Sequence, residues 1–205
     1  MPCITICLPV YNGAAFVEQA LASIAAQSHG DILVIVGDNA STDGTAKILR
    51  SWSSRLAMLI VTQDTTISMQ DHFNALIDRA ETDAYMVLCH DDYFCANHAL
   101  QAASEVLDSQ PRISAVYSDI AYVSEHGRDL ARRSFRRSGE QDADRLGRQT
   151  LRSARNMFGI PILVRTEALG ANRYDPDFRY IADVDLSWRI SERSPLWHIP
   201  EVLLA

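Results

Sequence analysis

The chain has 205 residues, of which 47% are hydrophobic and 22% charged, a balance typical of one soluble globular domain with a sizeable core. Its formal net charge of −7 argues against a general nucleic-acid binder, although a metal ion still allows an acidic site to accept a phosphorylated ligand. No apolar stretch approaches the roughly 18 residues of a spanning helix, and no basic leader precedes the first apolar run, so we expect a cytoplasmic setting.

In the first 120 residues, short apolar runs alternate with stretches whose apolar residues recur every three to four positions. The runs predict buried strands and the periodic stretches predict amphipathic helices. Strands are expected at Ile4–Val10, Ile32–Val36, Leu56–Val61, Ala84–Leu88 and Ile113–Tyr117, and helices at Ala14–Ala26, Thr45–Ser54, Ser68–Ala80 and His98–Asp108. This alternation predicts an α/β fold with a mostly parallel central sheet and helices on both faces.

The pattern changes after Val123. Residues 124–150 are polar, and Arg128–Arg137 holds five arginines against one aspartate. We expect a mobile connection or a loosely packed helix with a solvated charged face; a lid over a phosphate is the functional alternative. Ordered structure is predicted to resume with a strand at Pro161–Arg165, a helix at Asp183–Arg193 and short strands at Trp197–Ile199 and Val202–Leu204. The apolar end of the chain predicts that the native protein continues beyond Ala205.

Two adjacent acids, Asp91 and Asp92, follow the apolar run Met86–Cys89 after one residue, His90. Neighbouring carboxylates repel each other unless a cation or a hydrogen-bond donor lies close by. Oxygen ligands of this kind suit Mg²⁺ or Mn²⁺, which often bind one or two carboxylates together with substrate phosphates. The structural alternative is a loop with two solvated acids.

Two other predicted strands also end in unusual polar residues. Pro9–Gly13 offers Tyr11 for stacking on a flat base, and Asp38 follows Gly37 at the end of the next strand. Asp38 is placed to accept a hydrogen bond from the N–H of a base. The residues that follow, Ser41–Gly44, have the composition of a turn and a helix cap.

Taken together, these motifs resemble family 2 glycosyltransferases of the GT-A fold. The family pattern P-V-Y-N-G is matched by Pro9–Gly13, D-D-G-S-T-D-G-T by Gly37–Thr45, and the D-x-D-type acidic tip by Cys89–Asp92. A late E-D-x-D-L-x-x-R motif is matched by Ala182–Arg189. The resemblance runs from Ile4 to about Leu204. It implies a single domain over residues 1–205, with a nucleotide-binding half (1–120), the connection (124–150) and an acceptor-side half (151–205).

The resemblance also implies a role for each matching residue. Asp183 is the implied catalytic base, while Asp185 is interpreted as a charge that favours the helix N-terminus. The implied donor site consists of Pro9, Tyr11 and Asp38 around the nucleobase, His90 and Asp91 at the sugar nucleotide, and Asp91 with Asp92 on a divalent metal, Mn²⁺ or Mg²⁺. Three positions depart from the family pattern, because Gly37, Cys89 and Ala182 each stand where an acid is usual.

The predicted function is therefore a metal-dependent, inverting transfer of a sugar from a nucleotide-diphosphate donor, with a UDP-sugar favoured, to a hydroxyl acceptor such as a glycan or a lipid-linked sugar. A non-catalytic nucleotide-sugar-binding domain and a nucleotidyltransferase remain as alternatives. A dinucleotide oxidoreductase is disfavoured, because Pro9–Ala14 contains only one glycine. The arginine-rich stretch leaves peripheral contact with a membrane open, and no nucleic-acid partner is expected.

Overall fold

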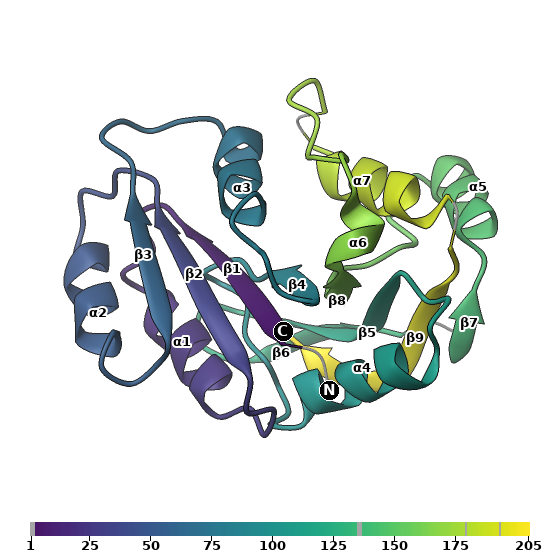
Figure 1. Cartoon of the computed structure of the whole chain (residues 1–205), viewed down its shortest axis with the longest axis horizontal. Helices are drawn as coiled ribbons and strands as arrows, with labels where there is room; N and C mark the ends of the chain where they lie inside the picture. Colours follow the sequence, from purple (N-terminus) through teal and green to yellow (C-terminus); the bar gives the residue numbers. More distant parts are fainter. Residues whose placement is uncertain (1–2, 135–136, 179, 193) are drawn as a thin grey trace.

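A computed structural model describes residues 3–134, 137–178, 180–192 and 194–205. Helices cover both faces of one central sheet (Figure 1). The strands are β1 (Ile4–Val10), β2 (Ile32–Asp38), β3 (Met58–Thr62), β4 (Ala84–Val87), β5 (Ala115–Val123), β6 (Asp129–Arg133), β7 (Gly139–Gln141), β8 (Pro161–Arg165) and β9 (Leu196–Leu204). The helices are α1 (Val17–Ala25), α2 (Thr45–Trp52), α3 (Met69–Ile77), α4 (Ala99–Ser109), α5 (Ala143–Ser153), α6 (Thr166–Leu169) and α7 (Ala182–Ser191).

The sheet has the strand order β3-β2-β1-β4-β8-β5-β9-β7, and β6 pairs with β5. The first four strands are parallel, so their carboxyl ends meet at one edge. Beyond β4 the pairing is mixed, because β8 runs antiparallel to both β4 and β5, while β5 and β9 are parallel. The predicted α/β class is therefore confirmed, and the parallel pairing lies mainly in the first half of the chain.

The core has two parts, one on each side of the sheet, because successive strand residues point to opposite faces. On one face, Ile4, Ile6 and Leu8 of β1 pack with α1, α2 and α4. On the other, Cys7 and Ile35 pack with α3, α5 and α7. None of the helices in the described ranges has the length and apolar composition needed to cross a membrane.

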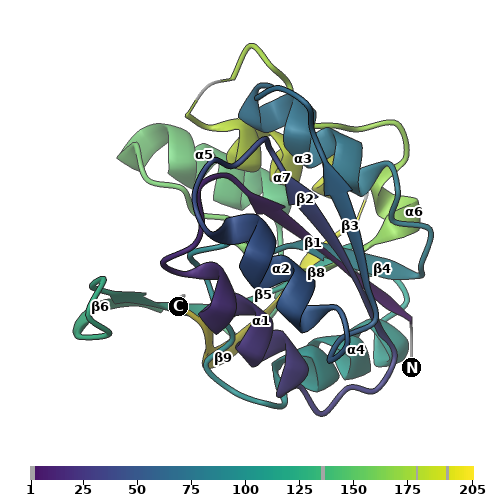
Figure 2. The same cartoon turned by 90° about the vertical axis from the view of Figure 1, so that its left-hand side faces the viewer.

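The structure corrects the prediction for residues 124–150, which hold two strands and a helix. β6 pairs antiparallel with the end of β5 and projects from the body of the molecule (Figure 2). Asp142 caps α5 by accepting a hydrogen bond from the Arg145 backbone N–H (3.1 Å). The inner side of α5 is buried, and a Cβ at Gly147 would lie 2.7 Å from the Trp188 ring, so α5 packs closely against α7. Phe135 and Arg136 of the arginine-rich run lie outside the described residues.

The end of the chain also differs in detail from the prediction. The two expected short strands are one strand, β9, whose pairing with β5 shifts register on either side of Asp119. The late helix begins at Ala182 and ends at Ser191; Arg193, its predicted last residue, lies outside the described residues. β9 is held centrally between β5 and β7, so this segment belongs to the sheet.

Candidate active site

The carboxyl ends of β1, β2 and β4 lie side by side, and they carry the first group of predicted site residues. Pro9 and Val10 of β1 pair with Gly37 and Asp38 of β2. On the other side of β1, Cys7 pairs with Val87 of β4, and the acidic tip follows. The topology thus places the ends of all three motifs at one edge of the sheet (Figure 1).

The loops after β1 and β2 hold each other in place by hydrogen bonds between backbone and side chains. Asn12 donates from its backbone N–H to Ser41 Oγ (2.9 Å), and its side-chain Oδ1 accepts from the Thr42 N–H (2.9 Å). The Gly13 and Ala14 N–H groups donate to Thr45 Oγ1 (2.9 Å) and Asp43 Oδ2 (3.0 Å). The turn-like composition of this region therefore serves to fix the two loops against each other.

The residues predicted to surround the base differ in exposure. Pro9 is buried within β1, whereas the Tyr11 side chain is 49% exposed at the strand end, where a flat ligand can reach it. Asp38 is only 3% exposed, and its Oδ1 accepts a hydrogen bond from the Ser41 N–H (3.0 Å). Asp38 thus shapes its own loop as well as lying at the predicted site.

Gly37 has a packing reason to depart from the family pattern. A Cβ at this position would lie 2.4 Å from Nε2 of His72 and 2.8 Å from Cδ2 of Leu76, both on α3. A side chain at position 37 would therefore require the His72 and Leu76 side chains to shift. His72 is 3% exposed, and burial lowers the pKa of its imidazole, an effect opposed by the nearby Asp38 carboxylate.

At the tip after β4, Asp91 is exposed and Asp92 is half-buried. Burial, together with the charge of Asp91, raises the pKa of Asp92 to about 7. A cation bound between the two carboxylates would favour the ionised form of Asp92 and so oppose both effects. His90 lies against the β1 loop, where a Cβ at Gly13 would be 2.7 Å from the imidazole Cδ2.

The donor set at this tip fits a divalent cation that completes its coordination with substrate oxygens. Asp91 and Asp92 offer two carboxylates, and Mg²⁺ and Mn²⁺ sites often need no more from the protein when phosphates are bound. Within the described ranges, no group of three or more histidine, cysteine or acidic residues gathers to hold a metal by itself. The fit therefore depends on a ligand that brings its own oxygens.

Asp183 lies across from this tip, in the first turn of α7. Asp183, Asp92 and Cys89 line the same cavity, which has a volume of about 260 Å³ and is walled by aromatic and aliphatic side chains, among them Phe73, Tyr85 and Tyr174. The negative charges of Asp92, Asp91 and Asp183 all act on the Cys89 thiol, whose pKa is raised chiefly by burial. The structure thus brings together acids that are separated by about ninety positions in the sequence.

The Asp183 carboxylate has both a raised pKa and a hydrogen-bond donor. Burial raises its pKa, and backbone N–H groups of α7, the Asn156 amide and the Arg133 guanidinium partly oppose that rise. Asn156 Nδ2 donates to Asp183 Oδ2 over 2.9 Å. Asp183 is an exposed residue, and its carboxylate, with a raised pKa and a fixed orientation, is suited to accept a proton.

The neighbours of Asp183 on α7 have structural roles. Asp185 accepts a hydrogen bond from Arg189 Nε (2.9 Å) one turn along the helix, and Arg189 continues to Asn172 Oδ1 (3.1 Å). Trp188 packs against Phe158, with ring centroids 6.3 Å apart. Asp185 thus has an ion-pair partner on its own helix, while its interpretation as a charge that favours the helix N-terminus stays a prediction.

Asn156 and Arg133 are site residues that the sequence motifs do not reveal. Asn156 also accepts hydrogen bonds at Oδ1 from the Phe158 and Gly159 N–H groups (2.8 and 3.1 Å), so its amide is fixed in a tight turn. The left-handed conformation of Ala154 (φ 52°) ends α5 just before it. An asparagine in a polar stretch is the only signal in the sequence, and it points equally to an ordinary turn.

Comparisons with known proteins show which sequences this chain resembles. The sequence model of Glycosyl transferase family 2 matches residues 5–175. A PGL/p-HBAD biosynthesis glycosyltransferase of Mycobacterium bovis, and its counterpart in Mycobacterium tuberculosis, are 28% identical over 190 residues, covering 92% of this chain and 69% of theirs.

Solved structures share the fold at lower identity. Staphylococcus aureus TarS, crystallised with UDP-GlcNAc, superposes with a TM-score of 0.80 at 17% identity, covering 98% of this chain. The mannosyltransferase PcManGT of Pyrobaculum calidifontis, solved with GDP-Man and Mn²⁺, has a TM-score of 0.70 at 20% identity over 98% of this chain. This chain spans 57% of that TarS chain and 55% of that PcManGT chain.

Proposed function

Because this chain belongs to glycosyl transferase family 2, we propose that it transfers a sugar from a nucleotide-diphosphate donor to a hydroxyl acceptor with inversion at the anomeric carbon. The observation that carries the proposal is the shared cavity of Asp92 and Asp183. One acid there belongs to the predicted diphosphate side and the other to the predicted acceptor side. A UDP-sugar is the favoured donor, and a glycan or a lipid-linked sugar is the favoured acceptor.

On the acceptor side, Asp183 takes the role of general base. The acceptor hydroxyl is a poor nucleophile until its proton leaves, and a carboxylate within hydrogen-bond reach removes that proton during attack. The acceptor oxygen forms a bond to C1 of the sugar, the bond from C1 to the diphosphate oxygen breaks, and the diphosphate keeps the electron pair. Asn156 orients the base by donating to its Oδ2 (2.9 Å).

On the donor side, the edge formed by β1, β2 and β4 binds the nucleotide. Tyr11 is exposed for stacking on the base, and Asp38, Pro9 and His90 complete the predicted contacts. Asp91 and Asp92 would hold Mn²⁺ or Mg²⁺ against the diphosphate. When bound, such an ion supplies Lewis-acid stabilisation of the charge that develops on the leaving group.

A screen of nucleotide sugars by thermal shift, with and without Mn²⁺, tests the donor, since a ligand raises the melting temperature by mass action. The donor that stabilises the protein most is then incubated with it, and the released nucleotide is identified. Free nucleoside diphosphate supports the proposal. Release of pyrophosphate indicates a nucleotidyltransferase, and binding without any release indicates a non-catalytic nucleotide-sugar-binding domain; either result overturns it.

A further inference from the structure

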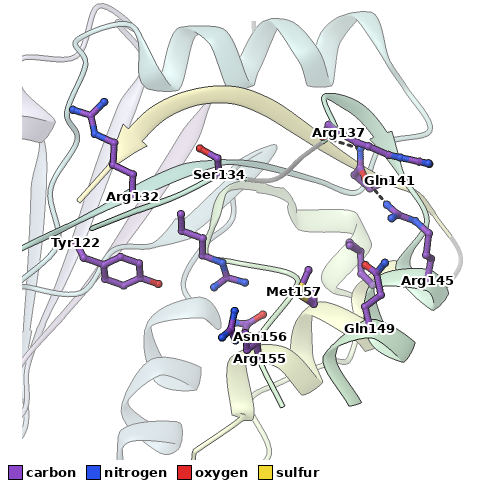
Figure 3. A pocket seen from close by; sticks show the side chains of 12 residues that line it. Tyr122, Arg132, Ser134, Arg137, Gln141, Arg145, Gln149, Arg155, Asn156 and Met157 are labelled. Carbon is purple, nitrogen blue, oxygen red and sulfur yellow. Dashed lines mark hydrogen bonds between the residues drawn. The ribbon is translucent and has the colours of Figure 1, made fainter. Parts of the chain in front are cut away.

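A second and larger cavity, of about 840 Å³, lies between the β6 segment and α5, and we call it the arginine groove (Figure 3). Five arginines from distant parts of the sequence line it, and no acidic residue appears among the described residues of its wall. They are Arg132, Arg133, Arg137, Arg145 and Arg155. In a chain of net charge −7, this groove concentrates positive charge at one place.

Much of this charge is not balanced within the protein. Arg132 forms an ion pair with Asp129 (3.4 Å), and both side chains are 67% exposed, so the pair is weak. Across the ranges that the structure describes, no carboxylate pairs with Arg137, Arg145 or Arg155. Guanidinium groups without a carboxylate partner in a hollow are suited to receive an anionic ligand.

The groove is supported by a fixed scaffold. The Gln141 side chain accepts from Arg145 Nη2 (2.7 Å) and donates to the carbonyl oxygen of Arg137 (3.2 Å), as Figure 3 shows. The same carbonyl lies 2.8 Å from Nδ1 of the buried His198, on β9, which lies between β5 and the edge strand β7. The Arg145 guanidinium and the Arg137 backbone are therefore held through Gln141 before any ligand arrives, which lowers the entropy cost of binding.

The groove leads to the proposed base. Asn156 lines the groove and donates its hydrogen bond to Asp183 over 2.9 Å. Arg133 also lines the groove, and its charge acts on the Asp183 carboxylate. A ligand lying in the groove would thus have one end at the carboxylate that we propose takes the acceptor proton.

We propose that the arginine groove binds the phosphate groups of an anionic acceptor, whose neighbouring hydroxyl then reaches Asp183. This inference rests on the proposed function and names its acceptor class: a molecule with phosphate groups close to the hydroxyl that receives the sugar. A guanidinium group can donate two parallel hydrogen bonds to the oxygens of one phosphate. Several guanidinium groups in one groove therefore suit a ligand with several phosphates better than a ligand with a single carboxylate.

Binding of soluble probes, measured without any donor, tests the groove. The probes are a short oligomer of glycerol phosphate, a neutral polyglycerol of the same length, and a galacturonate oligomer whose anionic groups are carboxylates. We expect the glycerol phosphate oligomer to bind most tightly, with an affinity that falls as salt is raised. The double variant Arg145→Gln/Arg155→Gln is expected to lose about tenfold in affinity or more, because each guanidinium–phosphate contact is charge-assisted.

The matched control is Arg148→Gln, one turn from Arg145 on α5. Arg148 is 65% exposed, pairs with Asp144 (3.6 Å) and does not line the groove, so its loss should leave probe binding unchanged. Because Arg145 also contacts Gln141, the single variant Arg155→Gln and a melting curve guard against a folding defect. A well-folded double variant with unchanged probe affinity would refute the proposal, as would equal binding of the galacturonate oligomer.

Binding to lipid vesicles is measured as well, to distinguish a groove for a soluble acceptor from a contact with a lipid surface. If vesicles containing phosphatidylglycerol bind through Arg145 and Arg155 while the soluble oligomer does not, the groove is a membrane contact and the acceptor proposal is wrong. Nucleoside diphosphate release without acceptor reports on the proposed function separately. Release without oligomer binding overturns the groove alone, and oligomer binding without release overturns the transferase alone.

Discussion

Asn156 donates a hydrogen bond from Nδ2 to Oδ2 of Asp183 over 2.9 Å, and this contact joins the two cavities of the molecule. On one side lies the acidic cavity with Asp92, and on the other the arginine groove. The hydrogen bond holds the carboxylate of the proposed base between the two. We infer that the acceptor reaches Asp183 from the arginine groove and the donor from the acidic cavity, so that the acceptor oxygen and the leaving diphosphate lie on opposite sides of the anomeric carbon.

The charge state of Asp183 should be visible in the pH profile of transfer. Burial raises its pKa, and Asn156 opposes that rise by donating to the ionised form. The base works only when deprotonated, so the rate should fall as pH drops through this raised pKa. Asn156→Asp keeps the turn-closing Oδ1 but replaces the donor with a like charge, and it should move the acidic limb up by about one pH unit or more. A profile of kcat against pH that is the same for both proteins would contradict this role of Asn156.

Asp92 should destabilise the metal-free fold at neutral pH. Its pKa of about 7 in the fold lies above the ordinary 3.8, so the folded state binds the proton more tightly than the unfolded chain does. Protonation of Asp92 stabilises the folded state fully below the ordinary pKa, and this stabilisation is lost as the pH rises through about 7. In EDTA at pH 8, Asp92→Asn should therefore be more stable than the wild type by up to about 4 kcal/mol, and the difference should shrink towards pH 4. Urea unfolding at the two pH values measures it, and a difference independent of pH would count against this account.

Asp91 is exposed and should act mainly through a metal ion. We expect Asp91→Ala to weaken nucleotide binding in the presence of Mn²⁺ and to change little in its absence, since the carboxylate is placed to bridge to the diphosphate through the ion. Calorimetric titration of nucleoside diphosphate with and without Mn²⁺ gives both affinities. If the variant keeps the full gain in affinity that Mn²⁺ gives the wild type, Asp91 is not a ligand.

A side chain at Gly37 should require the His72 and Leu76 side chains to shift, although an acid is usual there in the family. Because a Cβ would lie 2.4 Å from His72 Nε2, Gly37→Ala should cost about 1–3 kcal/mol of folding free energy, and Gly37→Asp at least as much. Gly30→Ala is the control, since a Cβ there meets nothing within 4 Å. Chemical unfolding of the three variants checks this. If Gly37→Asp keeps the wild-type stability, the His72 and Leu76 side chains of α3 shift at little cost in free energy, and the prediction is wrong.

The first half of the fold and the acids of the site could be predicted from sequence because their signals are local. The spacing of apolar residues predicts the strands and helices from β1 to α4. Asp91 and Asp183 each lie in a recognisable motif. The arginine groove could not be predicted, because the run that builds it has the composition of a solvated surface. Only the fold shows that Arg145 and Arg155 face a hollow without acidic partners.

Two other features were hidden for the same physical reason, since each depends on contacts between distant residues. The hydrogen bond from Asn156 to Asp183 joins residues 27 positions apart, and no sequence pattern predicts it. The glycine at position 37 is explained by His72 on a different element. The strands β6 and β7 are short and polar, so their composition does not predict strands. They are recognised only by their pairing with β5 and β9.

The central claim, that Asp183 removes the acceptor proton in a site that binds the donor at Asp91 and Asp92, is tested most directly by Asp183→Asn. Nucleotide-sugar affinity and the rate of sugar transfer are measured in parallel for the variant and the wild type. We expect donor affinity to be nearly intact and transfer to fall by roughly 10²–10⁴-fold, the range typical of general base catalysis. Transfer at the wild-type rate by a variant with intact donor affinity would contradict the account.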